Sequence, residues 1–247
     1  MSFHTYIDSL QLILEKIKTE QADKIRQAGR LVADSLFANG IIHAFGTGHS
    51  HLIAHEIFYR AGGLAAVNPI LDERLIFLKG VLESTRAERE TGLAKRILEN
   101  EQIEAGDVAI LISNSGRNAV PVEMALEMRA RGVKVIAVTS LEQSRSSTSR
   151  HPSGKRLFEL ADIAIDNGVP HGDAVLCLPG SLLRIGPSST VAGAAIVNSI
   201  VIEAAALLVE RNRKAPILPS ANIEGTTEET LKAILRPYAK RIRLLDV

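Results

Sequence analysis

Three turns rich in glycine, hydroxyl and amide side chains are the places where this sequence could hold an anion. Each turn follows an apolar run or opens one. Their polar and glycine residues are Gly46, Thr47, Gly48, Ser50, Ser113, Asn114, Ser115, Ser188, Ser189 and Thr190. Hydroxyl groups and the free backbone N–H groups at the start of a helix bind phosphate oxygens. The three turns together predict a phosphate site.

Each turn also has an ordinary structural interpretation. A plain strand-to-helix turn uses glycines to change direction and a serine such as Ser50 to cap the helix. The first turn lacks the third glycine of a dinucleotide-binding motif and the lysine of a P-loop. The second turn favours phosphate, because packing does not require the two closely spaced hydroxyls of Ser113 and Ser115.

The elements that would position these turns are short apolar runs that alternate with helix-like stretches. Five runs have the composition of parallel strands buried on both faces, at residues 41–45, 64–71, 107–112, 133–139 and 161–165. We therefore expect an α/β fold with a doubly wound, five-stranded parallel sheet flanked by helices. Ligands of such sheets collect at the carboxyl ends of the strands, where the turns lie.

Helices are expected on both sides of these strands. Apolar residues at three- and four-residue spacing predict two N-terminal helices. Crossover helices are expected at residues 50–61 and 119–131. Residues 141–155 are rich in serine and arginine and predict a polar, mobile loop, and residues 174–178 predict an additional edge strand.

The predicted domain organisation is one main domain followed by a tail. Residues 1–211 form the domain together with its N-terminal helical extension, because no linker interrupts them. Residues 212–247 form the tail, in which Thr226 and Glu229 have the spacing of a capping box. We expect the tail helix to pack on the domain or on a neighbouring subunit.

Composition argues against a nucleic-acid partner. The chain of 247 residues has a formal net charge of +1 and an aromatic content of 4%. Binding to nucleic acids usually depends on a basic surface and on stacking rings, and both signals are weak here. Any anion site must therefore be local.

The predicted setting is the cytoplasm, with no membrane partner. The lone cysteine, Cys177, lies in an apolar run, which predicts a core residue in a reducing compartment. The N-terminal residues are amphipathic and do not resemble a secretory leader. Residues 191–209 approach the length of a membrane span, but Asn198 and Glu203 favour a buried helix of a soluble protein.

Over residues 21–210 the chain resembles the sugar isomerase (SIS) family of phosphosugar-binding domains. The family pattern Gly-x-Gly-x-Ser after the first strand is matched by Gly46, Gly48 and Ser50. The pattern Ser-x-Ser-Gly after the third strand is matched by Ser113, Ser115 and Gly116. The third turn is similar to that of arabinose-5-phosphate isomerases, and the whole chain is similar to single-domain SIS proteins without an assigned substrate.

The resemblance implies an aldose–ketose isomerase for a sugar phosphate that works by acid–base catalysis without a cofactor. It also implies a homodimer or homotetramer, because SIS domains usually pair. Two alternatives stay open: a lyase, deaminase or epimerase acting on an amino-sugar phosphate, and a sensor that binds a sugar phosphate without converting it.

Isomerisation requires a base beside the carbonyl carbon and a group that moves protons between oxygens. Phosphoheptose isomerases and related etherases carry a catalytic glutamate ten residues after the first-turn serine, and here that position is Arg60. Glu56 lies one helical turn earlier, as a candidate base or as an ion-pair partner of Arg60. Glu73 is the preferred base, because arabinose-5-phosphate isomerases carry a glutamate near this position.

Histidines supply further candidates. His49 lies in the first turn, and His171 lies between turn-forming residues after the fifth strand, where it could act as an acid or open a sugar ring. His51 and His55 have a spacing that can bind a metal. No carboxylate follows them at a fixed spacing, so we expect no metal site.

Overall fold

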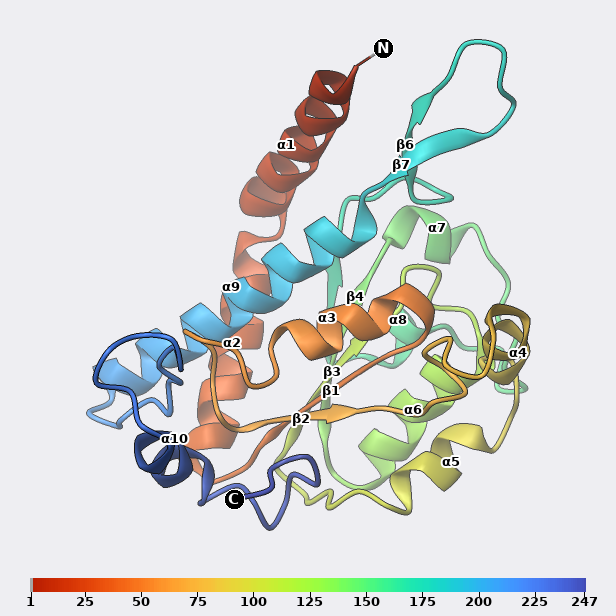
Figure 1. The fold of residues 1–247 in the computed structure, drawn as a ribbon. Helices are drawn as coiled ribbons and strands as arrows, with labels where there is room; N and C mark the ends of the chain where they lie inside the picture. Colours follow the sequence, from red (N-terminus) through yellow and green to blue (C-terminus); the bar gives the residue numbers. More distant parts are fainter. Residues whose placement is uncertain (1) are drawn as a thin grey trace.

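The computed structural model describes residues 2–247. Its centre is a five-stranded parallel sheet in the order β2-β1-β3-β4-β5 (Figure 1). The strands are β1 (Ile42–Gly46), β2 (Val67–Ile70), β3 (Val108–Ile112), β4 (Lys134–Thr139) and β5 (Ile163–Asp166). All neighbouring strands pair in parallel. The predicted fold class is confirmed.

Side chains that alternate along the strands build two separate cores. Val108, Ile110 and Ile112 belong to one apolar cluster, whereas Ala109 and Leu111 belong to the other. Successive side chains of a strand point to opposite faces, so a strand covered on both faces must be apolar throughout. This is why the strands read as continuous apolar runs.

Helices cover both faces of the sheet (Figure 1). The first cluster includes residues of α1 (Phe3–Glu20), α2 (Ala22–Phe37), α3 (His51–Glu56) and α9 (Ser189–Glu210). The second includes residues of α4 (Val81–Ala87), α5 (Leu93–Leu98), α6 (Ala119–Ala130) and α8 (Leu157–Leu160). The crossover helix α3 is shorter than predicted and is preceded by the 3-10 turn η1 (Gly48–Ser50).

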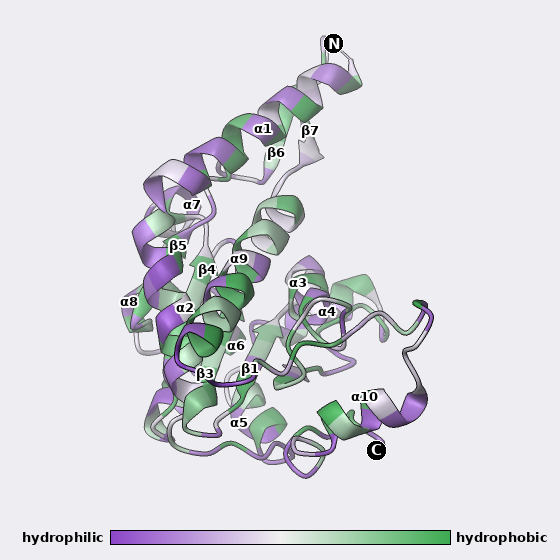
Figure 2. Ribbon diagram, turned by 90° about the vertical axis from the view of Figure 1, so that its left-hand side faces the viewer, coloured by the Kyte–Doolittle hydropathy of each residue, from purple (hydrophilic) through white to green (hydrophobic). Residues whose placement is uncertain are grey.

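Helix α9 is long and apolar enough to cross a membrane by length and composition. Figure 2 shows it coloured largely as hydrophobic. Its residues Ile196, Val197 and Ile200 are buried in the first cluster, where α9 packs mainly against α2. Burial within the protein therefore accounts for much of its apolar character.

The prediction of an additional edge strand at residues 174–178 is wrong. Strand β6 (Ala174–Cys177) pairs antiparallel with β7 (Arg184–Pro187), and the two form a separate hairpin. The hairpin projects from the sheet beside α1 (Figure 1). Cys177 is exposed on this hairpin, so its prediction as a core residue is also wrong. A short apolar run does not reveal which strand it pairs with.

Two other local expectations need correction. The polar segment after β4 begins with a helix, α7 (Leu141–Arg145), whose N-cap Ser140 accepts a hydrogen bond from the backbone of Gln143. In the tail, α10 (Glu228–Leu235) is capped by Thr227, which accepts from Thr230 N, rather than by Thr226 with Glu229. A shift of one residue in the cap moves the start of the helix by one residue.

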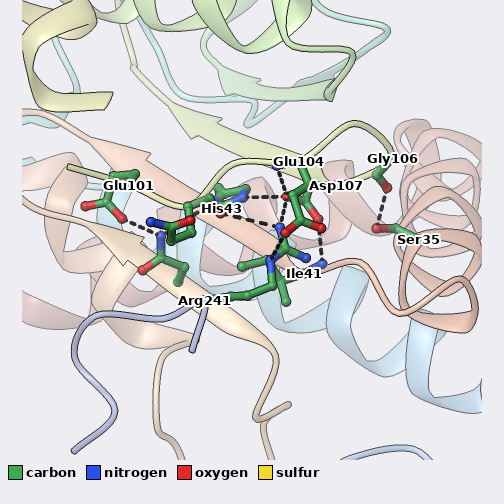
Figure 3. A network of polar contacts seen from close by, with 10 residues as sticks. Ser35, Ile41, His43, Glu101, Glu104, Gly106, Asp107 and Arg241 are labelled. Atoms are coloured by element: carbon green, nitrogen blue, oxygen red, sulfur yellow. Dashed lines mark hydrogen bonds and ion pairs between the residues drawn. The ribbon is translucent and has the colours of Figure 1, made fainter. Parts of the chain in front are cut away.

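The amino ends of the strands are closed by a buried polar network (Figure 3). Asp107 accepts from Ile41 N at 2.9 Å and from Glu104 N at 2.9 Å, and it pairs with Arg241 of the tail. His43 Nε2 lies 3.0 Å from the same carboxylate. Asn68 donates to Glu101 at 2.8 Å and lies 3.2 Å from His43 Nδ1, so the imidazole holds its proton on Nε2.

This network holds Asp107 as a carboxylate. Burial acts to raise its pKa, but hydrogen bonds from His43, Arg241 and two backbone N–H groups outweigh burial and keep the pKa well below its usual range. The tail thus binds the sheet through an ion pair between residues 134 positions apart in the sequence.

Candidate functional site

A pocket of about 350 Å³ lies at the opposite edge of the sheet, beside the carboxyl ends of β1 and β3. The first and second turns form one part of its lining, and residues between β2 and α5 form another. Its lining residues are Thr47, Gly48, His49, Ser50, Phe77, Ser84, Thr85, Glu88, Ser113, Asn114, Ser115, Asn118 and Gln143. The volume suits a small ligand.

The first turn is built by close packing of its own backbone. A Cβ added at Gly46 would lie 2.5 Å from the backbone carbon of Ser50, so only glycine allows this approach. Gly48 has φ +55° and its N–H donates to Leu75 O at 2.8 Å. The Ser50 hydroxyl makes no hydrogen bond to another residue of the range 2–247, which leaves it available to a ligand.

Hydrogen bonds to neighbouring segments hold the second turn in place, and its serine hydroxyls remain free to donate to a ligand. Asn114 donates to Gln143 Oε1 at 3.1 Å and accepts from Asn167 Nδ2 at 2.9 Å. The Ser113 hydroxyl accepts from Gly116 N at 3.2 Å, so its own proton can be donated to a ligand. Ser115 is half-buried and lines the same pocket. A rigid turn with free O–H donors suits an oxyanion.

Glu88 is the pocket residue that sequence reasoning missed. Its carboxylate accepts a hydrogen bond from Thr47 Oγ1 at 2.9 Å, and its backbone carbonyl accepts from Val120 N at 3.1 Å. The contact to Thr47 joins the first turn to the segment after α4. Residues 83–90 contain several carboxylates and arginines without a motif spacing, so only the fold singles out Glu88.

His49 lines the pocket and is exposed. Its ring centroid lies 5.2 Å from that of Phe77, at an interplanar angle of 57°. The neighbouring turn is tied to the Phe77 segment through Gly48 N and Leu75 O. The site therefore combines hydroxyl donors, which can hold an anion, with an imidazole and a carboxylate, which can transfer protons.

The third turn lies outside the residues that line this pocket. Asp173 accepts from Ser188 N at 2.9 Å, from Ser189 N at 2.7 Å and from the Ser189 hydroxyl at 2.8 Å. Asp173 thus places a carboxylate at the N-terminus of α9, where the free N–H groups and the helix dipole favour negative charge. Thr190 is half-buried at the same end of α9.

Three other predicted site residues also lie outside this pocket. Glu73 is exposed and pairs with Lys79 at 2.9 Å. Glu56 pairs with Arg60 at 3.1 Å and accepts from Asn198 of α9 at 3.1 Å. His171 is exposed, and its backbone N–H donates to Glu142 Oε1 at 3.1 Å.

The two histidines of α3 lie close together, with the ring centroids of His51 and His55 5.9 Å apart. Burial lowers the pKa of His55, and the neighbouring His51 lowers it further. Within residues 2–247, no group of three or more histidine, cysteine, aspartate or glutamate side chains is arranged to hold a metal ion.

A larger cavity, of about 450 Å³, lies at the other edge of the sheet beside the tail. Its charged lining comes from Arg213, Lys214 and Arg241, and no carboxylate among residues 2–247 lines it. Acid–base chemistry needs a group that accepts a proton, which the smaller pocket has in Glu88 and His49. We therefore assign the candidate site to the smaller pocket, although the other cavity is larger.

Comparison with known proteins gave matches to families and to folds. A family model described as the SIS domain matches residues 5–140. A UPF0309 protein of Listeria innocua is 45% identical over 99% of this chain and 98% of its own. A UPF0309 protein of Caldanaerobacter subterraneus is 43% identical over 97% of this chain and 98% of its own.

Two phosphoheptose isomerases share the fold. The structure from Neisseria gonorrhoeae has a TM-score of 0.54 at 18% identity and covers 81% of this chain and 96% of its own. The structure from Francisella tularensis has a TM-score of 0.52 at 19% identity and covers 81% of this chain and 95% of its own.

Proposed function

The chain belongs to the SIS domain family, and from this premise we propose that it binds a phosphosugar and interconverts its aldose and ketose forms. The phosphate would bind at the two turns that line the pocket. The observation that carries the proposal is the lining itself, which combines Ser50, Ser113 and Ser115 with Glu88 and His49. The fold shared with phosphoheptose isomerases supports the architecture of such an enzyme.

Binding would rest on hydrogen bonds rather than on a fixed cation at the turns. The hydroxyls of Ser50, Ser113 and Ser115 donate to phosphate oxygens, together with backbone N–H groups of the turns. Asn118, the N-cap of α6, is buried in the same lining and places a helix N-terminus beside the phosphate.

Turnover would require one base and one acid in the pocket. Glu88 removes the proton from the carbon beside the carbonyl, while His49 donates a proton to the carbonyl oxygen, and an enediol forms. Glu88 then returns its proton to the former carbonyl carbon, and His49 takes the proton of the neighbouring hydroxyl. The Thr47 hydroxyl orients the Glu88 carboxylate through the 2.9 Å hydrogen bond.

The other predicted acid–base residues fit this scheme less well. Glu73 and Glu56 are engaged in ion pairs outside the pocket. His171 is exposed in the loop before β6 and does not line the pocket. We therefore assign the base to Glu88 and retain His49 from the predicted set.

The experiment that tests the proposal is a thermal-shift screen with pentose, hexose, hexosamine and heptose phosphates, followed by NMR of each stabilising compound in D₂O. Isomerisation by proton transfer incorporates solvent deuterium at carbon. Ser113→Ala should reduce the stabilisation, whereas Ser9→Ala, in α1 outside the pocket, should keep it. Stabilisation without deuterium incorporation would indicate a sensor, and absence of stabilisation by every phosphosugar would exclude the site.

Self-association is part of the proposal. Helix α1 and the β6–β7 hairpin expose apolar side chains, among them Phe3, Leu12, Leu182 and Leu183. Phe3 lines an apolar groove together with Tyr6 and Ile185. Burial of such a surface against a second copy is favourable. Light scattering should detect a dimer or tetramer, and Leu182→Asp with Leu183→Asp should shift it to smaller species.

A further inference from the structure

Three arginines without an acidic partner lie next to residues that line the candidate pocket. Arg117 follows the second turn directly, Arg150 lies in the loop after α7, and Arg89 follows the pocket residue Glu88. None of the three forms an ion pair with a carboxylate of residues 2–247. The excess positive charge therefore lies beside the proposed phosphosugar site, in a chain whose net charge is only +1.

Hydrogen bonds attach this group to the pocket lining. Arg150 Nη1 donates to Asn118 Oδ1 at 2.8 Å, and Asn118 lines the pocket. The Arg150 backbone N–H donates to Arg117 O at 2.8 Å, which holds the two residues together. Arg117 Nη2 donates to Thr148 Oγ1 at 3.3 Å. The loop after α7 is thus attached to the second turn through these two arginines.

The donors of the two guanidinium groups are only partly used. Arg117 Nε is buried and has no hydrogen-bond partner among residues 2–247. A buried donor without a partner is destabilising, and an arginine that serves only as a structural clamp would have it satisfied. A guanidinium presents its N–H groups as a planar fork that matches a carboxylate or a phosphate.

Electrostatics agree with this geometry. Burial lowers the pKa of Arg150, and the charges of Arg117 and Arg89 lower it further, while Glu88 acts in the opposite direction. The like charges are therefore close enough to repel one another, and a single nearby carboxylate opposes them. That carboxylate already accepts the hydrogen bond from Thr47. An added anion would relieve the repulsion.

We propose that the phosphosugar carries a second anionic group, a carboxylate or another phosphate, which Arg117 and Arg150 bind. This inference rests on the proposed function, in which the first phosphate occupies the hydroxyl turns. The turns have their own O–H and N–H donors for that phosphate, so the arginines are available to the other end of the ligand. The substrate class is a phosphorylated sugar acid or a sugar bisphosphate.

Matched ligand pairs separate the second anion from the first. 6-Phosphogluconate and glucitol 6-phosphate differ only in a carboxylate in place of a hydroxymethyl group. Fructose 1,6-bisphosphate and fructose 6-phosphate differ by one phosphate. By calorimetry at constant ionic strength, the doubly anionic member of at least one pair should bind about tenfold more tightly, the size expected for one charge-assisted contact. The pair that shows the difference identifies the second group.

Variants then assign the difference to the arginines. Arg117→Gln and Arg150→Gln should each reduce the advantage of the doubly anionic ligand and leave the affinity for its partner within about twofold, a change below that of one hydrogen bond. Arg145→Gln is the matched control, because Arg145 is exposed in α7 and its side chain forms no ion pair with residues 2–247. If a variant fails to fold, the ligand pairs on the wild-type protein still decide.

The outcomes distinguish the two proposals. Equal affinity within both pairs would overturn the second-anion site and leave the phosphosugar site intact. An equal loss for both members of a pair in Arg117→Gln and Arg150→Gln would also overturn it, since the arginines would then serve the shared phosphate. Failure of every phosphorylated ligand to bind would remove the proposed function and this inference together.

Discussion

The amino ends and the carboxyl ends of the strands use polar residues in opposite ways. Below, the amino ends are called the closed edge of the sheet and the carboxyl ends its open edge. At the amino ends of the strands, Asp107 is almost fully buried and binds His43, Arg241 and two backbone N–H groups (Figure 3). At the carboxyl ends, the hydroxyls of Ser50 and Ser115 have no partner among residues 2–247. A closed network stabilises the fold, whereas free donors on a rigid support are what a ligand site needs.

The difference shows why buried polar residues alone do not identify a site. The network of His43, Asp107 and Arg241 is the more conspicuous cluster of ionisable groups. The carboxylate of Asp107 already accepts hydrogen bonds from several groups, so this network contains no free base. The pocket around Glu88 holds fewer contacts, and its carboxylate accepts one side-chain hydrogen bond, from Thr47. Chemistry requires groups that can still accept or donate.

The largest expected effect lies at the closed edge. Asp107→Ala leaves His43, Arg241 and two backbone N–H groups without their acceptor, so the free energy of unfolding should fall by about 3–5 kcal/mol. Urea denaturation measures it. Ser115→Ala at the open edge is the matched comparison and should change the same quantity by less than about 0.5 kcal/mol. Similar losses of unfolding free energy in Asp107→Ala and Ser115→Ala would contradict the proposed difference between the two ends of the strands.

At the open edge, the largest effect should be on turnover. Glu88→Gln keeps the shape of the side chain but removes the base, so the rate of isomerisation should fall by about a hundredfold or more. Ligand affinity, measured by calorimetry, should change little, because the hydroxyl turns are intact. Glu90→Gln is a suitable control, since Glu90 pairs with Arg96 outside the pocket. Full activity of Glu88→Gln would exclude Glu88 as the base.

The closed edge should also respond to pH. The folded-state pKa of Asp107 lies below its unfolded value, so its contribution to stability is complete above about pH 4 and declines as the pH falls toward the folded pKa. Asp107→Asn should flatten this acid-side decline in the free energy of unfolding.

A surface carboxylate provides the control for the pH experiment. A hydrogen bond from Arg156 lowers the pKa of Glu159 to about 2, so its contribution has the same sign. Solvent screens this more exposed pair, and Glu159→Gln should alter the acid-side slope less than Asp107→Asn. The opposite order would show that Asp107 does not dominate the acid response.

The smallest effect concerns a single hydroxyl of the pocket. Ser113→Ala removes one O–H donor and should weaken phosphosugar binding by about tenfold, the value of one hydrogen bond to a charged group. Ser189→Ala should leave affinity unchanged, because the Ser189 hydroxyl donates to Asp173 at 2.8 Å outside the pocket. A larger loss for Ser189→Ala would return the third turn to the site.

The sequence predicted those parts of the molecule that depend on local pattern. Strands β1, β3 and β4 lie in apolar runs that follow one another between glycines and helices, so their place in one parallel sheet could be predicted. The first and second turns were recognisable because glycine and hydroxyl residues recur after these strands. The hairpin of β6 and β7 could not be recognised, because its antiparallel pairing depends on a partner strand on the far side of a loop.

The site shows the same division. His49, Ser50, Ser113 and Ser115 could be identified from their turns, and the structure places them around one pocket. Glu88 could not be identified, because it reaches the pocket only when α4 packs beside the first turn. Glu73 and Glu56 satisfy the requirement for a carboxylate near a turn, but in the fold they form ion pairs elsewhere.

By itself, then, the sequence determined the α/β class, the parallel sheet and the two turns at its carboxyl edge, because these follow from hydrophobic period and from backbone chemistry over a few residues. Only the tertiary structure decided which carboxylate faces those turns, that Asp173 occupies the N-terminus of α9, and that Arg241 closes the opposite edge through Asp107. Each of these contacts joins residues more than a dozen positions apart, and the packing of whole elements, rather than local pattern, sets their distance.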